Sequence, residues 1–223
     1  MGAKIKLKAT DGHEFGAYVA EPGAAARAAI VVIQEIFGVN GHIRSVADGY
    51  AKKGYCAIAP ALFDRVERDL ELSYTPEDSK RGMGVATKVG MENALLDVAA
   101  AIAHATGLSS GGKVGVVGFC WGGTLAWLSA TRLSVAAAVG YYGGQIAKYA
   151  EEAPKCAVML HFGEKDQNIP ASETEKIQKA HPEVPIFLYD AGHGFNCDQR
   201  GSYEPKSAAR ARERSLGFFG RYL

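Results

Sequence analysis

The chain has 223 residues, enough to form one well-packed domain. With 48% apolar and 22% charged residues, its composition is that of a soluble globular protein and argues against a disordered or fibrous chain. The 25 basic and 24 acidic residues nearly balance, so charge gives no basis for binding nucleic acid or an anionic membrane. We therefore expect a single domain over 1–223 and a monomer.

The N-terminal residues and the cysteines indicate the compartment. The first residues alternate lysine with apolar residues and lack the apolar core of a signal peptide, so we expect a cytoplasmic protein. No apolar run approaches the roughly 20 residues needed to cross a bilayer. The cysteines show neither CxxC nor zinc-ligand spacing, which predicts free thiols and no metal site; they are Cys56, Cys120, Cys156 and Cys197.

Strand and helix patterns alternate along the chain. Residues 3–8 and 14–20 alternate polar and apolar side chains around Asp11-Gly12, which is typical of a β-hairpin. The run 28–35 is apolar and β-branched, as expected of a strand buried on both faces. Further short apolar runs predict strands at 55–60, 113–119, 135–142, 156–162 and 184–190. Apolar spacings of three and four predict helices near 41–53, 90–106, 122–132, 171–180 and 205–222.

This alternation predicts an α/β fold. We expect a doubly wound, mostly parallel sheet with an antiparallel N-terminal hairpin, helices on both faces, and an active site at the carboxyl ends of the strands. Residues 62–84 are highly charged and lack a strand signal. This segment is expected to form an irregular or short helical excursion over the sheet, in the position of a lid.

The strongest local signal is Gly118-Phe119-Cys120-Trp121-Gly122-Gly123, between a predicted strand and a predicted helix. In G-x-S-x-G elbows, glycines flank the nucleophile because larger neighbours would collide with the strand and the helix. Here a cysteine replaces the serine at a helix N-terminus, where the macrodipole favours a thiolate. An inert buried thiol is the alternative interpretation of an isolated cysteine.

Acid and base candidates follow Cys120 in the α/β-hydrolase order of nucleophile, acid and base. Asp166 comes just after the strand at 156–162, and His193 comes just after the strand at 184–190. Alone, this aspartate is more typical of a loop or helix-cap carboxylate, with Glu164 as a rival, and the histidine of a turn between glycines. Jointly, the three positions predict a Cys–His–Asp triad in which Asp166 orients His193.

These motifs resemble the dienelactone hydrolase family over nearly the whole chain. The resemblance also includes DGHEFGAYVAEP near the start, QEIFGVN at 34–40 and GYYGG at 140–144. It implies an α/β-hydrolase fold and a small ester or lactone as substrate.

By the same resemblance, Glu35 is a buried carboxylate that holds the resting Cys120 thiol and takes up its proton when substrate binds. From the residues alone, a glutamate at the end of an apolar strand is anomalous and marks a functional candidate. A strand-end carboxylate that reaches solvent is the alternative. Both the resemblance and generic elbow geometry place the oxyanion hole at the backbone N–H groups of Ile36 and Trp121.

Substrate recognition departs from the family pattern. The family holds a substrate carboxylate with two arginines, but Cys197 stands at the position of the second. Lys80 or Arg81 is the candidate for the first cation, and Arg200 lies slightly beyond the second, although each is equally interpreted as a solvated surface charge. Gly194 stands where the family often has serine.

Aromatic residues near these motifs are expected to form the walls of a pocket for a compact unsaturated or ring substrate, with core packing as the alternative. They are Phe37, Trp121, Tyr141, Tyr142 and Phe195. The leading hypothesis is hydrolysis of a small lactone or ester through an acyl-cysteine, with no metal or organic cofactor. A broad carboxylesterase or thioesterase with a neutral substrate is the alternative favoured by the replaced arginine. A non-catalytic binding protein of the same fold fits less well, because no triad member or elbow glycine is missing.

Overall fold

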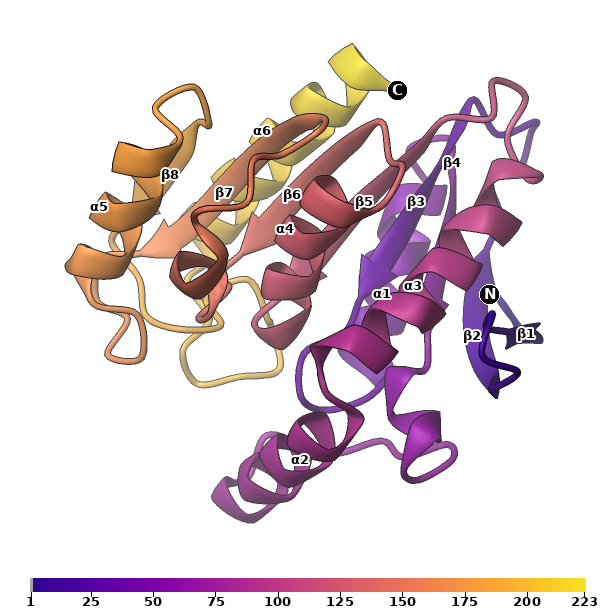
Figure 1. Cartoon of the computed structure of the whole chain (residues 1–223), viewed down its shortest axis with the longest axis horizontal. Helices are drawn as coiled ribbons and strands as arrows, with labels where there is room; N and C mark the ends of the chain where they lie inside the picture. Colours follow the sequence, from indigo (N-terminus) through magenta and orange to yellow (C-terminus); the bar gives the residue numbers. More distant parts are fainter. Residues whose placement is uncertain (1) are drawn as a thin grey trace.

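A computed structural model describes residues 2–223. Its centre is an eight-stranded sheet with the strand order β1-β2-β4-β3-β5-β6-β7-β8 (Figure 1). The strands are β1 (Ala3–Lys8), β2 (Glu14–Ala20), β3 (Ala28–Ile33), β4 (Tyr55–Pro60), β5 (Val114–Phe119), β6 (Ala137–Tyr141), β7 (Ala157–Gly163) and β8 (Ile186–Tyr189). Strand β2 pairs antiparallel with both β1 and β4, whereas the pairs from β4 through β8 are parallel. The predicted α/β sheet with its antiparallel N-terminal hairpin is therefore confirmed.

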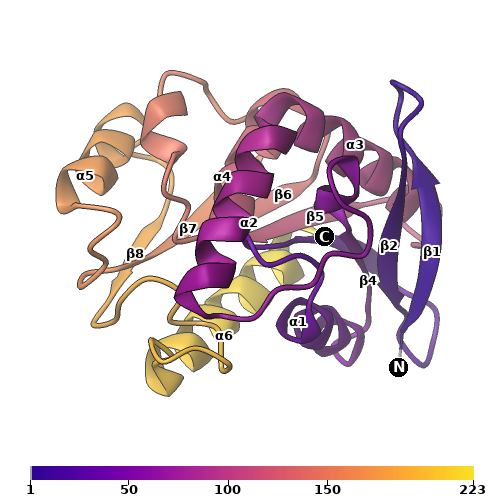
Figure 2. The same ribbon diagram turned by 90° about the horizontal axis from the view of Figure 1, so that it is seen from below.

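Helices cover both faces of the sheet. They are α1 (Gly41–Ala51), α2 (Pro76–Val89), α3 (Met91–Thr106), α4 (Trp121–Arg132), α5 (Ala171–Ala180) and α6 (Pro205–Tyr222), with short 3₁₀ turns η1 (Leu62–Arg65) and η2 (Ile146–Tyr149). Figure 2 shows α1 and α6 on one face and α3, α4 and α5 on the other. None of the helices in residues 2–223 is both long and apolar enough to span a bilayer.

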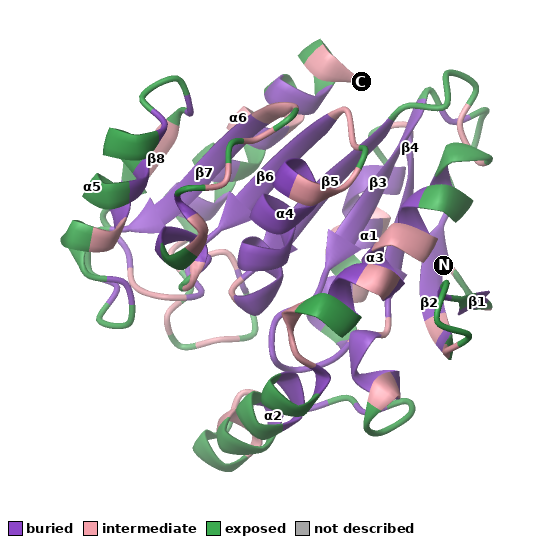
Figure 3. Ribbon diagram, viewed as in Figure 1, coloured by how far each residue is buried: buried purple, intermediate pink, exposed green. Residues whose placement is uncertain are grey.

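The core lies where these layers meet. Every residue of β3 and of β5 is buried. Figure 3 shows the central strands buried, with exposed residues on the outer faces of α3 and α5, whereas α4 is itself almost entirely buried. Two-sided burial explains why these strands are continuous apolar runs with no alternation of polar residues. The carboxyl ends of β3 and β5 lie side by side, because Ile33 pairs with Gly118. This register brings the segments after both strands to one edge of the sheet.

The excursion at 62–84 is more regular than expected. Helix α2 has 14 residues, and the Thr75 hydroxyl caps it by accepting a hydrogen bond from the Asp78 N–H at 3.1 Å. Pro76 occupies the first turn together with Glu77 and Asp78, as is typical of helix N-termini. On α2 the charged residues Glu77, Lys80, Arg81 and Lys88 are exposed, whereas Asp64 and Arg65 of the preceding turn are largely buried. Figure 3 shows this exposed face of α2. Charge thus indicated solvent exposure for α2 only, and the capping residues Thr75 and Pro76 indicated the helix.

Candidate active site

Cys120 lies on a sharp turn between β5 and α4. Its backbone has φ of 53° and ψ of −115°, a conformation that residues other than glycine rarely adopt. A Cβ at Gly118 would lie 1.8 Å from the Gly122 carbonyl oxygen, and one at Gly122 would lie 2.5 Å from the Ile33 carbonyl oxygen. The strand and helix therefore approach too closely for any other residue at these two positions, which leaves the thiol on a constrained turn.

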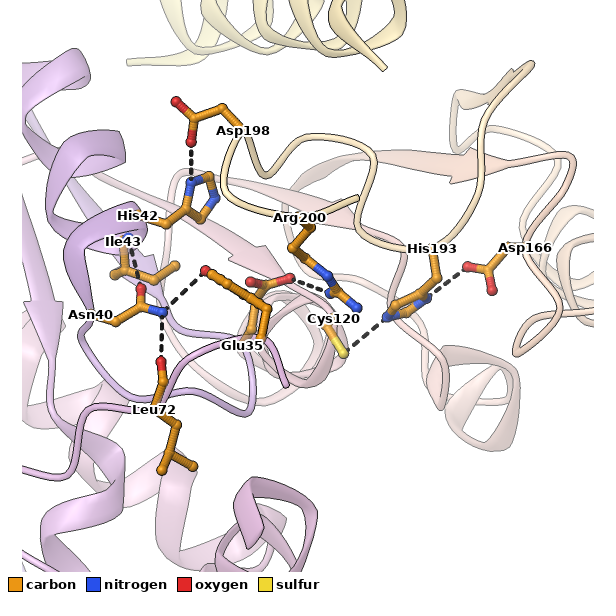
Figure 4. Close-up of polar contacts among 11 residues, drawn as sticks. Glu35, Asn40, His42, Ile43, Leu72, Cys120, Asp166, His193, Asp198 and Arg200 are labelled. Atoms are coloured by element: carbon orange, nitrogen blue, oxygen red, sulfur yellow. Dashed lines mark hydrogen bonds and ion pairs between the residues drawn. The ribbon is translucent and has the colours of Figure 1, made fainter. Parts of the chain in front are cut away.

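Two loops bring His193 and Asp166 to this thiol. The His193 Nε2 lies 3.1 Å from Sγ of Cys120, and its Nδ1 lies 2.7 Å from Oδ2 of Asp166 (Figure 4). The Asp166 side chain is fully buried, whereas the rival carboxylate of Glu164 is exposed. The structure thus brings together the three residues that the sequence singled out, in the order thiol, imidazole, carboxylate.

The surroundings of His193 change its acidity. Burial lowers the pKa of the imidazole, but the hydrogen bonds and charges of Asp166 and Cys120 outweigh burial and raise this pKa to about 10. This raised pKa favours the protonated imidazolium, which is the form of the ring that would pair with a thiolate on Cys120. Such an imidazolium–thiolate pair can attack a carbonyl carbon and then supply a proton to a leaving group.

The backbone N–H groups of Ile36 and Trp121 are available to a ligand. Within residues 2–223 neither donates a hydrogen bond. Trp121 is the first residue of α4, so its N–H has no acceptor in the preceding turn and lies at the positive end of the helix dipole. Both residues line the same cavity as Cys120. Two backbone N–H donors beside a nucleophile can form an oxyanion hole, which stabilises the negative oxygen of a tetrahedral intermediate.

Glu35 is buried between β3 and α1, and its partner is Arg200. One oxygen, Oε1, lies 3.3 Å from Nη1 of Arg200, and the other, Oε2, has no hydrogen-bond partner among the described residues (Figure 4). The contact that the resemblance implied between Glu35 and the Cys120 thiol is not formed in this conformation, because the thiol lies on His193. The solvent-exposed alternative for Glu35 is wrong, since the residue has no exposed surface.

A cavity of about 550 Å³ opens above Cys120 and His193. Helix α2 forms one wall of this cavity with Ser79, Met83, Ala86 and Thr87. The other lining residues are Ile36, Phe37, Gly90, Met91, Cys120, Trp121, Thr124, Gly144, Gln145, Asn168, His193 and Arg200. The excursion therefore lies over the site, as a lid would.

The cation expected from α2 is not in this lining. Lys80 and Arg81 lie on α2 outside the cavity, and the Arg81 guanidinium donates a hydrogen bond to Glu67 at 2.7 Å. Arg200 instead comes from the loop that carries His193, and its guanidinium carbon lies 5.6 Å from the ring centre of Phe37. Among the described residues that line the cavity it is the only arginine or lysine.

The aromatic wall is smaller than expected. Phe37 and Trp121 line the cavity, but Tyr141, Tyr142 and Phe195 do not. These three are buried in the core, where the Tyr142 ring packs edge-on against His193 with centroids 5.1 Å apart. Tyr142 thus supports the imidazole from behind, and Tyr141 and Phe195 pack against Tyr142, which corrects their expected role as substrate contacts. Sequence reasoning missed Asn168, although its N–H donates to Oδ1 of Asp166 at 2.8 Å and its position in the same loop was a usable signal.

The sheet order, the strained turn at Cys120 and the adjoining histidine and aspartate define the class: this is an α/β-hydrolase fold. Sequence comparison then assigns the family. A profile of the dienelactone hydrolase family matches residues 15–223, and the chain belongs to that family.

Individual relatives cover most of the chain. The "Putative carboxymethylenebutenolidase" of Synechocystis sp. is 38% identical over 216 residues, covering 89% of this chain and 88% of its own. The "Carboxymethylenebutenolidase" of Pseudomonas putida is 36% identical, covering 96% of this chain and 94% of its own. A crystal structure described as a "Putative Dienelactone Hydrolase" from Klebsiella pneumoniae superposes with a TM-score of 0.86 at 30% identity, covering 99% of this chain and 100% of its own.

Proposed function

We propose that this protein hydrolyses a small lactone or ester through an acyl-enzyme on Cys120. The observation that carries the proposal is the continuous contact from Sγ through His193 to Asp166, at 3.1 and 2.7 Å, beneath a cavity large enough for a small substrate. The names of the curated relatives, which describe a lactone hydrolase, agree with this chemistry.

The geometry supports a two-stage reaction. The Cys120 thiolate attacks the carbonyl carbon, and the carbonyl oxygen gains the electron pair and is stabilised by the N–H groups of Ile36 and Trp121. Collapse of the tetrahedral intermediate breaks the carbon–oxygen bond, and His193 donates its proton to the leaving alkoxide. The neutral imidazole then takes a proton from water, which attacks the thioester and releases the acid. Asp166 holds the tautomer that places Nε2 toward the sulfur.

Arg200 is the group that would bind a carboxylate on the substrate. It already pairs with Glu35, so an anionic substrate would compete with Glu35 for the guanidinium. By resemblance to the family, a Glu35 released in this way is the carboxylate that takes up the thiol proton. The relatives' name, carboxymethylenebutenolidase, denotes a lactone that carries such an acidic group. A carboxylate-bearing lactone is therefore the substrate class we propose.

A neutral ester or thioester is the second candidate. The observation that favours it is the cavity lining, which is largely apolar or uncharged apart from His193 and an Arg200 already neutralised by Glu35. Under this alternative, Cys120 and His193 keep the same roles and Arg200 is a positioning residue for Glu35.

Steady-state hydrolysis of a dienelactone and of a neutral aryl ester separates these possibilities. Cys120→Ala should lower turnover of the preferred substrate by about 10³-fold or more, because the nucleophile is lost. Cys156→Ala, which changes a half-buried thiol elsewhere, is the matched control and should keep turnover. Full activity of Cys120→Ala on every hydrolysed substrate would overturn the proposal.

Arg200→Gln decides between the substrate classes. If the substrate carboxylate binds Arg200, this variant should raise KM for the dienelactone by about tenfold or more, since a charge-assisted pair is lost. Cleavage of the neutral ester should fall much less. Equal losses on both substrates would favour the neutral-ester alternative.

A further inference from the structure

A second cluster of reactive side chains lies immediately behind the active site. Glu35, His42 in the first turn of α1, and Cys197 in the loop after His193 are all buried. Their ligand atoms, namely one carboxylate oxygen, one imidazole nitrogen and the sulfur, all lie within 4.8 Å of one another. Figure 4 shows Glu35 lying between His42 on one side and Arg200 with Cys120 on the other. The cluster therefore shares Glu35 with the site described above.

Two atoms of this cluster lack the partners that buried polar groups require. The Oε2 of Glu35 and the Nε2 of His42 are buried, and neither has a hydrogen bond among the described residues. Leaving such groups unpaired costs about 1–3 kcal/mol each, so their persistence in a well-packed core calls for a partner. The ring of His42 is held in place, because it packs edge-on against Phe119 with centroids 6.3 Å apart.

The orientation of His42 leaves one nitrogen free for a ligand. Its Nδ1 faces the Asp198 carboxylate at 3.4 Å; in the tautomer that donates this hydrogen bond, the proton is on Nδ1 and the lone pair is on Nε2. A carboxylate on the far nitrogen of a histidine is the usual arrangement behind metal-binding imidazoles. The open side of the ring thus presents an acceptor within the cluster.

We propose that Glu35, His42 and Cys197 bind a thiophilic divalent cation of the zinc class, and that the bound ion inhibits hydrolysis. Thiolate, imidazole and carboxylate are the three donors that Zn²⁺ prefers. With zinc–ligand bonds of about 2.0–2.3 Å, the donor atoms of a tetrahedral site lie roughly 3–4 Å apart. Small side-chain rotations that move the ligand atoms by about 1 Å would bring these three atoms to that spacing. The Cys197 thiol releases its proton to solvent as the zinc–sulfur bond forms. A water molecule completes the four-coordinate site.

Charge and access are compatible with this ion. The ligating carboxylate and thiolate carry two negative charges and Arg200 carries one positive charge, so the protein part of the site stays net negative. A groove of about 480 Å³ borders the cluster and is lined by Asn40, Gly41, Tyr74 and Gln199, among others. Gly41 and Gln199 adjoin His42 and Asp198 in the chain, although none of the three proposed ligands itself lines the groove.

Inhibition follows because Glu35 belongs to both sites. A cation bound at Oε2 lowers the basicity of the Glu35 carboxylate, so Glu35 can no longer take up the proton of the Cys120 thiol, even while Oε1 stays on Arg200. This part of the inference rests on the proposed hydrolase function, whereas binding of the ion does not. The two parts are therefore tested separately.

Cobalt(II) titration of the Cys120→Ala protein tests binding. This background removes the Cys120–His193 pair, the other place where a thiophilic metal could bind. We expect one equivalent of Co²⁺ to produce a sulfur-to-cobalt charge-transfer band together with the visible bands of a tetrahedral ion, and Zn²⁺ to displace it. Adding Cys197→Ser should abolish the charge-transfer band, and His42→Gln should weaken Co²⁺ binding by about tenfold or more. Adding Cys156→Ser is the matched control and should change nothing.

Absence of these bands in Cys120→Ala, or their survival after Cys197→Ser, would overturn the site. Circular dichroism checks that each variant is folded. If Cys197→Ser does not fold, then retention of full Co²⁺ affinity by His42→Gln would overturn the site by itself.

Inhibition is tested on the protein with Cys120 intact, in a phosphine reductant because thiols chelate zinc. Hydrolysis of the preferred ester should fall as free Zn²⁺ rises, and a chelator should restore it. In Cys197→Ser, inhibition should require at least about tenfold more Zn²⁺, while turnover without zinc is kept. If Cys197→Ser is inhibited by the same Zn²⁺ concentration as wild type, zinc acts at Cys120 and His193, and the inhibitory role of the cluster is overturned. Whether the cluster binds a metal ion is then decided by the cobalt titration alone. Failure of the proposed hydrolase function would be visible separately, as absence of turnover before zinc is added.

Discussion

Gly194, the residue after His193, explains how Arg200 reaches the cavity. Its backbone has φ of 77°, and a Cβ there would lie 2.5 Å from Nη1 of Arg200. Glycine is therefore needed both for the left-handed backbone and for the space that the guanidinium occupies. Arg200 lies over Gly194 and places a cation beside Glu35.

Gly194→Ser should displace Arg200 from Glu35. The added side chain strains the positive φ and occupies the guanidinium position, so kcat/KM for an anionic lactone should fall by roughly tenfold or more. The matched control is Gly201→Ser, because a Cβ at Gly201 meets no atom within 4 Å. Kinetics on the anionic and the neutral ester measure the effect. Equal kcat/KM in wild type and Gly194→Ser would contradict this role for Arg200.

Asp166 is predicted to control both the turnover and the titration of His193. Asp166→Asn removes the carboxylate on Nδ1, so turnover should fall by roughly 10²–10⁴-fold and the pKa of His193 should drop from its raised value of about 10. NMR titration of the imidazole measures the pKa directly. An unchanged histidine pKa in Asp166→Asn would show that Asp166 does not hold this proton.

The same shift gives a pH dependence of stability. Because the folded-state pKa of His193 is raised from 6.5 to about 10, its stabilising protonation is fully present below about pH 6.5 and is lost as pH rises towards 10. The free energy of unfolding of wild type should therefore exceed that of Asp166→Asn most at about pH 6, and the difference should shrink towards pH 10. Urea unfolding at both pH values measures it, and a difference that grows with pH would contradict the assignment.

Among the elements, α2 bears most directly on the site through its contact with Ile36. A Cβ at Gly82 would lie 1.8 Å from the Ile36 carbonyl oxygen, so the helix backbone packs directly on the loop that carries one proposed oxyanion donor. On the other side of that loop, a Cβ at Gly38 would lie 2.0 Å from the Leu70 carbonyl oxygen. The loop after β3 is therefore clamped between α2 and the segment that precedes it.

Gly82→Ala should lower kcat by roughly tenfold or more, because the methyl group pushes α2 away from Ile36 and displaces its N–H group. Gly84→Ala on the same helix is the matched control, since a Cβ there meets no atom within 4 Å and alanine favours the helix. Comparison of kcat for the two variants is the measurement. If both retain wild-type kcat, α2 does not position the oxyanion donor.

For the whole molecule, Arg65 joins the excursion to the main fold. Its guanidinium makes two hydrogen bonds of 2.7 Å to the fully buried carboxylate of Asp97 on α3, and a third of 2.7 Å to Asp11 in the N-terminal hairpin turn. One side chain thus ties η1, α3 and the edge of the sheet together. Burial raises the pKa of Asp97 despite Arg65, so this carboxylate depends on its partner.

Arg65→Met should lower the free energy of unfolding by about 3–5 kcal/mol, because a buried carboxylate loses its partner. Arg81→Gln, which breaks an exposed pair with Glu67, should change it by about 0–1 kcal/mol. Urea unfolding of the two variants provides the comparison. Equal stabilities would mean that the buried pair contributes no more than a surface one.

Local patterns in the sequence determined the strands, the helices and the proposed triad. Buried parallel strands are continuous apolar runs, and the strained turn at Cys120 requires its flanking glycines, so both are visible in the residues themselves. The order of Cys120, Asp166 and His193 at strand ends was also visible, because the carboxyl ends of parallel strands meet at one edge. Helix α2 is longer than the short or irregular segment that was predicted, although Thr75 and Pro76 are typical residues for a helix N-terminus.

Only the tertiary structure decided which polar groups meet across the chain. The proposed substrate cation is Arg200 and not Lys80 or Arg81, because the side of α2 that faces the cavity depends on how that helix packs. Tyr141, Tyr142 and Phe195 form core and not cavity wall, because the way the sheet and the His193 loop pack decides which side of them faces the cavity. The neighbourhood of Glu35, His42 and Cys197 has no sequence spacing that could reveal it. Residues 165 positions apart, such as Glu35 and Arg200, come together only when the sheet places their loops at one edge.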